Sequence, residues 1–96
     1  MKDRSAGKID VIGIDACKGY FPDDEKLVFR ETDDIKGALE VTDGKTVYGY
    51  VTGNYSLFIK AVIASGEDVY CVKESEKIVD ASKVCTVNAF RKYRKI

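Results

Sequence analysis

Hydrophobic and polar positions between Thr46 and Glu74 predict a strand, a helix and a second strand. Thr46 to Thr52 is β-branched and aromatic with no charge, which is typical of a buried strand. Tyr55 to Ser65 then has a helical pattern, and Gly66 supplies a left-handed stop after it. Asp68 to Lys73 follows as the second strand. A helix of this length most easily joins parallel neighbours through a right-handed crossover, so the pattern predicts one βαβ unit.

The predicted helix is apolar on most of its surface. A helix of this kind has to be covered by other parts of the fold. We therefore expect the βαβ unit to form the core, with Leu57, Phe58 and Ile63 buried in it.

The N-terminal half of the chain predicts two further strands. Ile9 to Asp15 is largely apolar, as in a central strand, and Lys26 to Thr32 is the next strand. The short connection between them holds the turn-former Pro22, which favours an antiparallel hairpin. Apolar residues at i, i+3 and i+4 spacing indicate a short helix over Asp33 to Glu40, and a strand over Ala38 to Thr42 is the alternative.

The C-terminal part predicts a helix that begins at Glu76 with Ser75 as its cap. An apolar stripe continues at helical spacing, but Val84 to Val87 favours β-structure. Whether the helix is continuous there, or breaks and restarts at Asn88, is left open by the pattern.

These elements together predict an α/β domain with a small mixed sheet of about four strands. A chain of 96 residues is expected to form one domain. Residues 1–7 mix charged and small residues without an apolar period and are expected to be a flexible N-terminus. Residues 8–96 form the predicted domain.

The net charge of zero hides an uneven layout. Acidic residues dominate from Asp23 to Asp43, whereas the C-terminal part is basic. Five basic residues there are candidates for contacts with nucleic-acid phosphates: Lys83, Arg91, Lys92, Arg94 and Lys95. The alternatives are a solvated helix end and a set of charges that balances the acidic segment within the fold.

Cysteine and histidine content restricts the possible chemistry. The three cysteines form no Cys-x-x-Cys pair and there is no histidine, which leaves few zinc ligands and no Ser/His or Cys/His catalytic pair. Free thiols in a reducing compartment are the expectation. Because no run of about 18 apolar residues and no signal-peptide pattern occur, we expect a cytoplasmic protein that does not enter membranes.

Two positions at predicted strand ends are candidate sites. Asp15 directly follows an apolar strand, where a carboxylate can bind Mg²⁺; a turn-capping aspartate is the alternative. Thr52, Gly53 and Asn54 form a strand-to-helix turn whose free N–H groups can bind a phosphate, and a plain turn capped by Asn54 is the alternative. Tyrosines such as Tyr70 can stack on bases, but their alternation in strands favours core packing.

Three segments carry a resemblance to a known family. Gly13 to Lys18 (Gly-Ile-Asp-Ala-Cys-Lys) resembles the Gly-Ile-Asp-Val-Ser-Lys opening of the RuvC-like, RNase H-like N-terminal domain of DEDD transposases. Thr52 to Tyr55 is similar to that family's Thr-Gly-Val-Tyr segment, and Gly66 to Val72 is similar to its Gly-x-x-Val-x-x-Val strand. The resemblance implies an RNase H-like fold and a nucleic-acid partner, with Asp15 at a metal position.

The chain departs from the family at its catalytic positions. Tyr50 stands where the resembling family has a catalytic glutamate, and Asp80 could only imitate the end of its later acidic segment. Two-metal chemistry needs several oxygen ligands around ions about 4 Å apart. The resemblance therefore implies the fold without ordinary nuclease activity.

We therefore expect a small nucleic-acid-binding protein, binding DNA or RNA, without nuclease activity and without a cofactor. One alternative is a metal-dependent nuclease that uses Asp15 with Asp80 and Mg²⁺. Another is a structural or regulatory domain that self-associates through its apolar helix.

Overall fold

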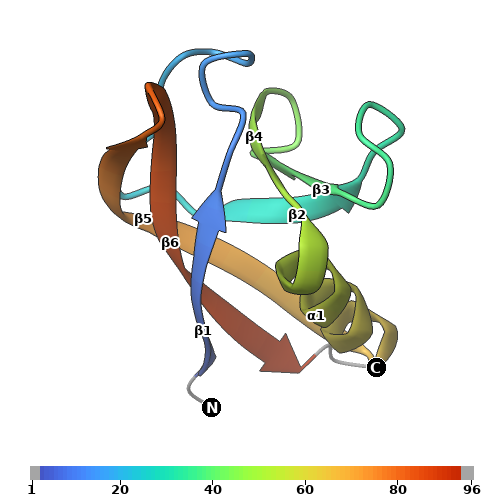
Figure 1. Ribbon diagram of the computed structural model, residues 1–96. Coiled ribbons are helices and arrows are strands. Elements are labelled where there is room, and N and C mark those ends of the chain that lie inside the picture. The colour runs from blue at the N-terminus through green and yellow to red at the C-terminus, as the bar shows by residue number, and fades with distance from the viewer. Residues whose placement is uncertain (1–2, 94–96) are drawn as a thin grey trace.

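An antiparallel sheet makes up most of the computed structural model, which describes residues 3–93 (Figure 1). The elements of this part are β1 (Arg4–Val11), β2 (Leu27–Glu31), β3 (Leu39–Thr42), β4 (Val47–Val51), α1 (Gly53–Ala64), β5 (Glu67–Val79) and β6 (Ser82–Tyr93). β1 begins within the stretch expected to be flexible, and α1 ends at the predicted stop, where Gly66 has a φ of +95°.

The sheet curls until its outer strands meet. Its strand order is β1-β6-β5-β2-β3-β4, and every named pair of neighbours is antiparallel. An isolated antiparallel bridge between Ile12 and Tyr50 then joins the end of β1 to β4. The result is a small, incompletely closed barrel, with the β5–β6 hairpin extending beyond it (Figure 1).

The core fills the inside of this barrel. Strand alternation sends every second side chain inward, and the largest fully buried hydrophobic side chains come from five strands, the β1–β2 connection and α1: Val11, Ile14, Leu27, Leu39, Val41, Val51, Ile59 and Val87. α1 packs against the open part of the barrel with Ile59 and Val62 buried. There β2 and β5 pair only at Leu27–Cys71 and Val28–Tyr70.

The predicted α/β, RNase H-like fold with a βαβ unit is wrong. β4 and β5 are separated in the sheet by β3 and β2, and the alternating strand directions make them antiparallel. The strand and the helix predicted from the pattern are both present, as β4 and α1. The error lies in the pairing, because a helix of this length can also cross the open part of a barrel.

Three other expected elements differ from the structure. The predicted strand from Ile9 does not pair with β2; β1 pairs with β6 instead. The segment predicted as a C-terminal helix from Glu76 is instead the end of β5, the Asp80–Ala81 turn and β6. Its apolar residues also fit a period of two, and Cys85, Val87 and Ala89 are all buried from β6. The helix considered over Asp33 to Glu40 is a turn followed by β3, which matches the strand alternative.

Candidate binding surfaces

The outer face of the sheet carries a row of side chains across four strands. The register pairs Ser5 of β1 with Phe90 of β6, Phe90 with Tyr70 of β5, and Tyr70 with Val28 of β2. Directly opposite residues in antiparallel strands project from the same face. Tyr70 and Phe90 are stacked, with ring centroids 5.3 Å apart and planes inclined by 23°.

Among the described residues, neither end of the Tyr70–Phe90 stack is covered by a further aromatic ring. The ammonium group of Lys26 lies 4.9 Å from the centroid of the Tyr70 ring, which is a cation–π contact. At the other end, Ser5 is exposed and has no ring of its own. The Tyr70 hydroxyl donates a hydrogen bond to Asp3 at 2.5 Å; this bond, together with burial, raises the pKa of Tyr70.

Charges around the stacked rings are mixed. Lys92 is exposed on β6, two positions beyond Phe90. Lys8 pairs with Glu74 at 3.0 Å, and the Asn88 side-chain amide donates to the same glutamate at 3.3 Å. Because cations and carboxylates alternate on this face, an anion is attracted weakly and is screened readily by salt.

Two of the five basic residues singled out in the sequence, Arg91 and Lys83, have partners inside the fold. Arg91 forms an ion pair and hydrogen bonds with Glu67, which is only 4 % exposed and also binds Arg4. The hydrogen bond from Arg91, helped by the one from Arg4, lowers the pKa of the Glu67 carboxyl below its ordinary value, although burial acts in the opposite direction. Arg91 thus has a structural role.

Lys83 also has partners in the fold. Its ammonium group donates to the Gly19 carbonyl at 3.0 Å, and its backbone N–H donates to Asp15 at 3.0 Å. Of the predicted basic residues, Lys92 remains exposed on β6. Arg94 and Lys95 lie outside the described residues.

The two acidic candidates lie in turns. Asp15 is in the β1–β2 connection and joins it to the start of β6 through the Lys83 backbone. Asp80 occupies the β5–β6 turn with a φ of +50°. Within residues 3–93, no group of three or more His, Cys, Asp or Glu side chains is arranged to hold a metal ion.

The candidate phosphate-binding turn is at the start of α1. Thr52, not Asn54, is the N-cap residue, and its side chain makes no capping hydrogen bond. Gly53 and Asn54 are exposed in the first turn. The first helical turn contains no acidic side chain. The turn therefore retains the positive end of the helix dipole, without a second feature that would define a phosphate site.

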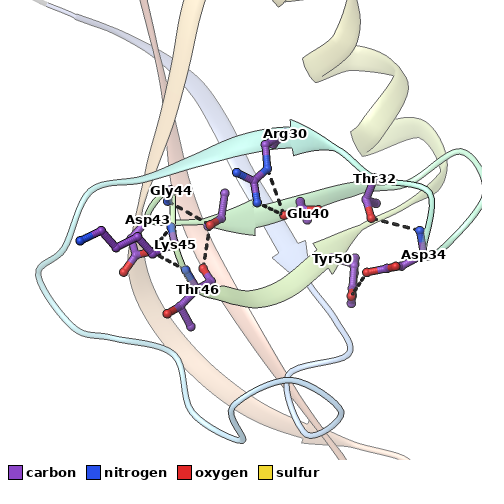
Figure 2. A network of polar contacts seen from close by, with 10 residues as sticks. Arg30, Thr32, Asp34, Glu40, Asp43, Gly44, Lys45, Thr46 and Tyr50 are labelled. Carbon is purple, nitrogen blue, oxygen red and sulfur yellow. Dashed lines mark hydrogen bonds and ion pairs between the residues drawn. The ribbon is translucent and has the colours of Figure 1, made fainter.

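A polar network covers the β2–β3–β4 meander (Figure 2). Arg30 pairs with Glu40 at 2.5 Å across β2 and β3, and Tyr50 donates to Asp34 at 3.2 Å. Burial and this hydrogen bond raise the pKa of Tyr50 to about 12. Tyr50 therefore remains protonated and acts as a hydrogen-bond donor at the position where the resembling family has glutamate.

Next to Tyr50 lies an open hollow of about 420 Å³, lined by Ala16, Cys17, Lys18, Lys45, Thr46, Val47 and Tyr50. Burial raises the pKa of the Cys17 thiol. A thiol rather than a thiolate is a poor nucleophile at neutral pH. The hollow thus offers hydrogen bonds and two lysines but no activated nucleophile.

No protein-family model matches the chain, and no match is found among curated proteins or solved structures. The class of protein is therefore defined by the structure itself: a small antiparallel barrel with one helix across its open part. Within residues 3–93, no helix is long and apolar enough to cross a bilayer; α1 has 12 residues.

Proposed function

We propose that this protein is a small binding module that takes single-stranded DNA or RNA on the outer face of β5 and β6. The observation that carries the proposal is the stacked pair Tyr70–Phe90 on a strand surface, with Lys26 over one end of the stack. Aromatic side chains on open sheets stack on unpaired bases, and nearby cations contact the phosphates.

In this proposal a base lies beyond Phe90, on the β1 side of the row. Phe90 has a tyrosine on one side and the small Ser5 opposite it on β1. A base entering above Ser5 would extend the existing stack against Phe90. Lys92 and Lys26 lie toward the β6 and β2 sides of the rings and can reach the backbone of a strand bound there.

The proposal includes no nuclease step. Asp15, which matches the metal position of the resembling family, accepts a hydrogen bond from the Lys83 backbone N–H. Tyr50 supplies a protonated hydroxyl where that family has a carboxylate. A cytoplasmic location is also part of the proposal. It is supported by three cysteines that form no disulfide in the structure.

Fluorescence anisotropy with labelled oligo-dT and oligo-U tests the proposal. Phe90→Leu keeps an apolar side chain but removes the ring, and we expect it to weaken binding about 5- to 100-fold, the usual effect of losing one stacked base. Tyr20→Leu is the matched control, because Tyr20 is an exposed ring in the β1–β2 connection. It should leave binding unchanged.

Salt dependence supplies a second measurement. Lys26→Gln and Lys92→Gln should each lower the log–log salt slope by about 0.7, the value for one phosphate contact on a single strand. Lys36→Gln, in the exposed β2–β3 turn, should not. A wild-type protein that binds neither oligonucleotide at low salt, or a Phe90→Leu variant that melts normally and binds as well as wild type, would refute the proposal.

A further inference from the structure

α1 has two apolar sides, and only one of them faces the core. Ser56, Ile59 and Val62 are buried against the barrel. On the opposite side the helix presents Leu57, which is 63 % exposed, and Phe58, which is 43 % exposed. Side chains at spacings of three and four residues share a helix face. This opposite side, the outer α1 face, consists of Asn54, Leu57, Phe58, Ala61, Ala64 and Ser65.

The outer α1 face carries no charge. The charged residue in α1 is Lys60, which lies at the margin of the outer α1 face. The Lys60 ammonium group is 3.4 Å from the Gly37 carbonyl oxygen. Solvent-facing sides of surface helices are normally polar. Contiguous apolar residues on a folded surface mark a place where another surface binds.

Side-chain sizes along the outer α1 face follow a pattern about Ala61. Leu57 and Phe58 are large and lie toward the N-terminus, whereas Ala64 and Ser65 are small and lie toward the C-terminus. Residues 57 and 65 are equally far from Ala61 in sequence, and so are residues 58 and 64. The face is therefore complementary to itself when a second copy is turned end for end.

We propose that two copies of this chain pair through their outer α1 faces, with the helices antiparallel about a two-fold axis near Ala61. Leu57 of one copy packs over Ser65 of the other, and Phe58 packs over Ala64. A two-fold interface uses the same patch on both subunits. Ala61 lets the helices approach to about 8 Å, the short end of the usual interhelical range.

Charge complementarity also favours this arrangement. α1 has no acidic residue in its first turn and no basic residue in its last turn, so side chains do not neutralise its dipole ends. Antiparallel pairing brings the positive N-terminal end of one helix toward the negative C-terminal end of the other. A charged partner would gain no ion pair on this face.

The dimer is expected to be weak. Two helices of 12 residues, each about 18 Å long, offer less contact area than the roughly 1,200 Å² at which standard interfaces begin, so the pairing is of the weak, transient kind. Association should therefore depend on concentration in the micromolar range. The inference does not depend on nucleic-acid binding, which uses the face of β5 and β6.

Sedimentation equilibrium across a concentration series tests the pairing. Wild type should shift from the monomer mass toward the dimer mass as concentration rises. Leu57→Arg places a charge in the interface and should give a monomer throughout. Ile78→Arg is the matched control, because Ile78 is equally exposed, at 68 %, but lies at the end of the β5–β6 hairpin. It should associate like wild type.

An exchange of side chains tests the orientation. Phe58→Ala and Ala64→Phe should each weaken association, the first by losing packing and the second by placing two large rings together. The double variant Phe58→Ala/Ala64→Phe restores a large residue opposite a small one and should recover much of the association. A wild type that remains monomeric at millimolar concentration, dimers that persist in Leu57→Arg, or a double variant no better than either single one would overturn the proposal.

Discussion

The backbones of Ile12 and Tyr50 exchange two hydrogen bonds, of 2.9 and 2.8 Å, and these join the two outer strands of the sheet. The residue before Tyr50 is Gly49, directly beneath this junction. A Cβ atom at Gly49 would lie 2.6 Å from Val11 Cγ1 and 2.9 Å from the Ile12 carbonyl oxygen. The two strands can meet this closely because position 49 has no side chain.

Gly49→Ala should therefore open the junction or strain it. We expect a loss of at least about 1–3 kcal/mol of unfolding free energy, the usual effect of overpacking, measured by urea denaturation. Gly44→Ala separates the two possible costs, because its Cβ would meet nothing within 4 Å and its loss comes from the backbone strain of an alanine at a φ of +100°. A Gly49→Ala variant as stable as wild type would show that the strands do not approach as described.

Ala81→Gly should stabilise the protein. Asp80 and Ala81 form the tight turn of the β5–β6 hairpin, and Ala81 has a φ of +65°, a conformation that costs an alanine about 1 kcal/mol. Glycine removes most of this strain, so the melting temperature should rise. The same change at Ala61, inside α1, should lower the stability of the dilute protein by about 1 kcal/mol. Two changes of the same sign would contradict this turn geometry.

Replacement by alanine should cost far more stability at Ile59 than at Leu57. Ile59 is fully buried, and Ile59→Ala should cost about 2–5 kcal/mol. Leu57 projects into solvent, and Leu57→Ala should change the stability of the dilute monomer by less than about 0.5 kcal/mol. Thermal melts at low concentration measure both. A large loss for Leu57→Ala would place that residue in the core, as the sequence pattern predicted.

Glu67 should make stability depend on acid pH. Its pKa in the folded state is lowered from 4.5 by Arg91 and Arg4. The stabilisation is therefore fully present above about pH 4.5 and is lost as the pH falls through the lower folded pKa. Arg91→Gln should reduce this loss, seen as a smaller difference between urea midpoints at pH 6 and pH 3. Lys8→Gln, which removes an exposed partner of Glu74, should have a smaller effect. An Arg91→Gln protein with the wild-type acid profile would contradict the assignment.

Local pattern predicted several elements but not their pairing. α1 and β4 were recognised because helix periodicity, a left-handed glycine and an uncharged β-branched run are short-range signals. The partner of β1 is β6, at the other end of the described chain, and no local pattern encodes that choice. The β5–β6 hairpin was missed because its apolar spacing fits periods of both two and 3.6, and its turn is Asp80–Ala81 rather than a glycine-containing pair.

The residues of the candidate surfaces could not be predicted from the sequence for the same reason, because they depend on which distant strands pair. Tyr70 was expected to pack in the core, yet the register places its ring on the outer face beside Phe90. The C-terminal charges were visible in the sequence, but the pairing of Arg91 with Glu67 required the β5–β6 register. Helix apolarity was recognised correctly, whereas exposure of Leu57 could not be known without the barrel.

The pairing of β1 with β6 affects the order in which this protein can fold as it is made. A ribosome releases β1 before the other described strands, but the strand that hydrogen-bonds to it, β6, follows all of them. Until then, Ile9 and Val11 have no β6 residues to cover them. The β2–β3–β4 meander and α1 can form during synthesis, while barrel closure waits for the last strand and is completed after it has been released.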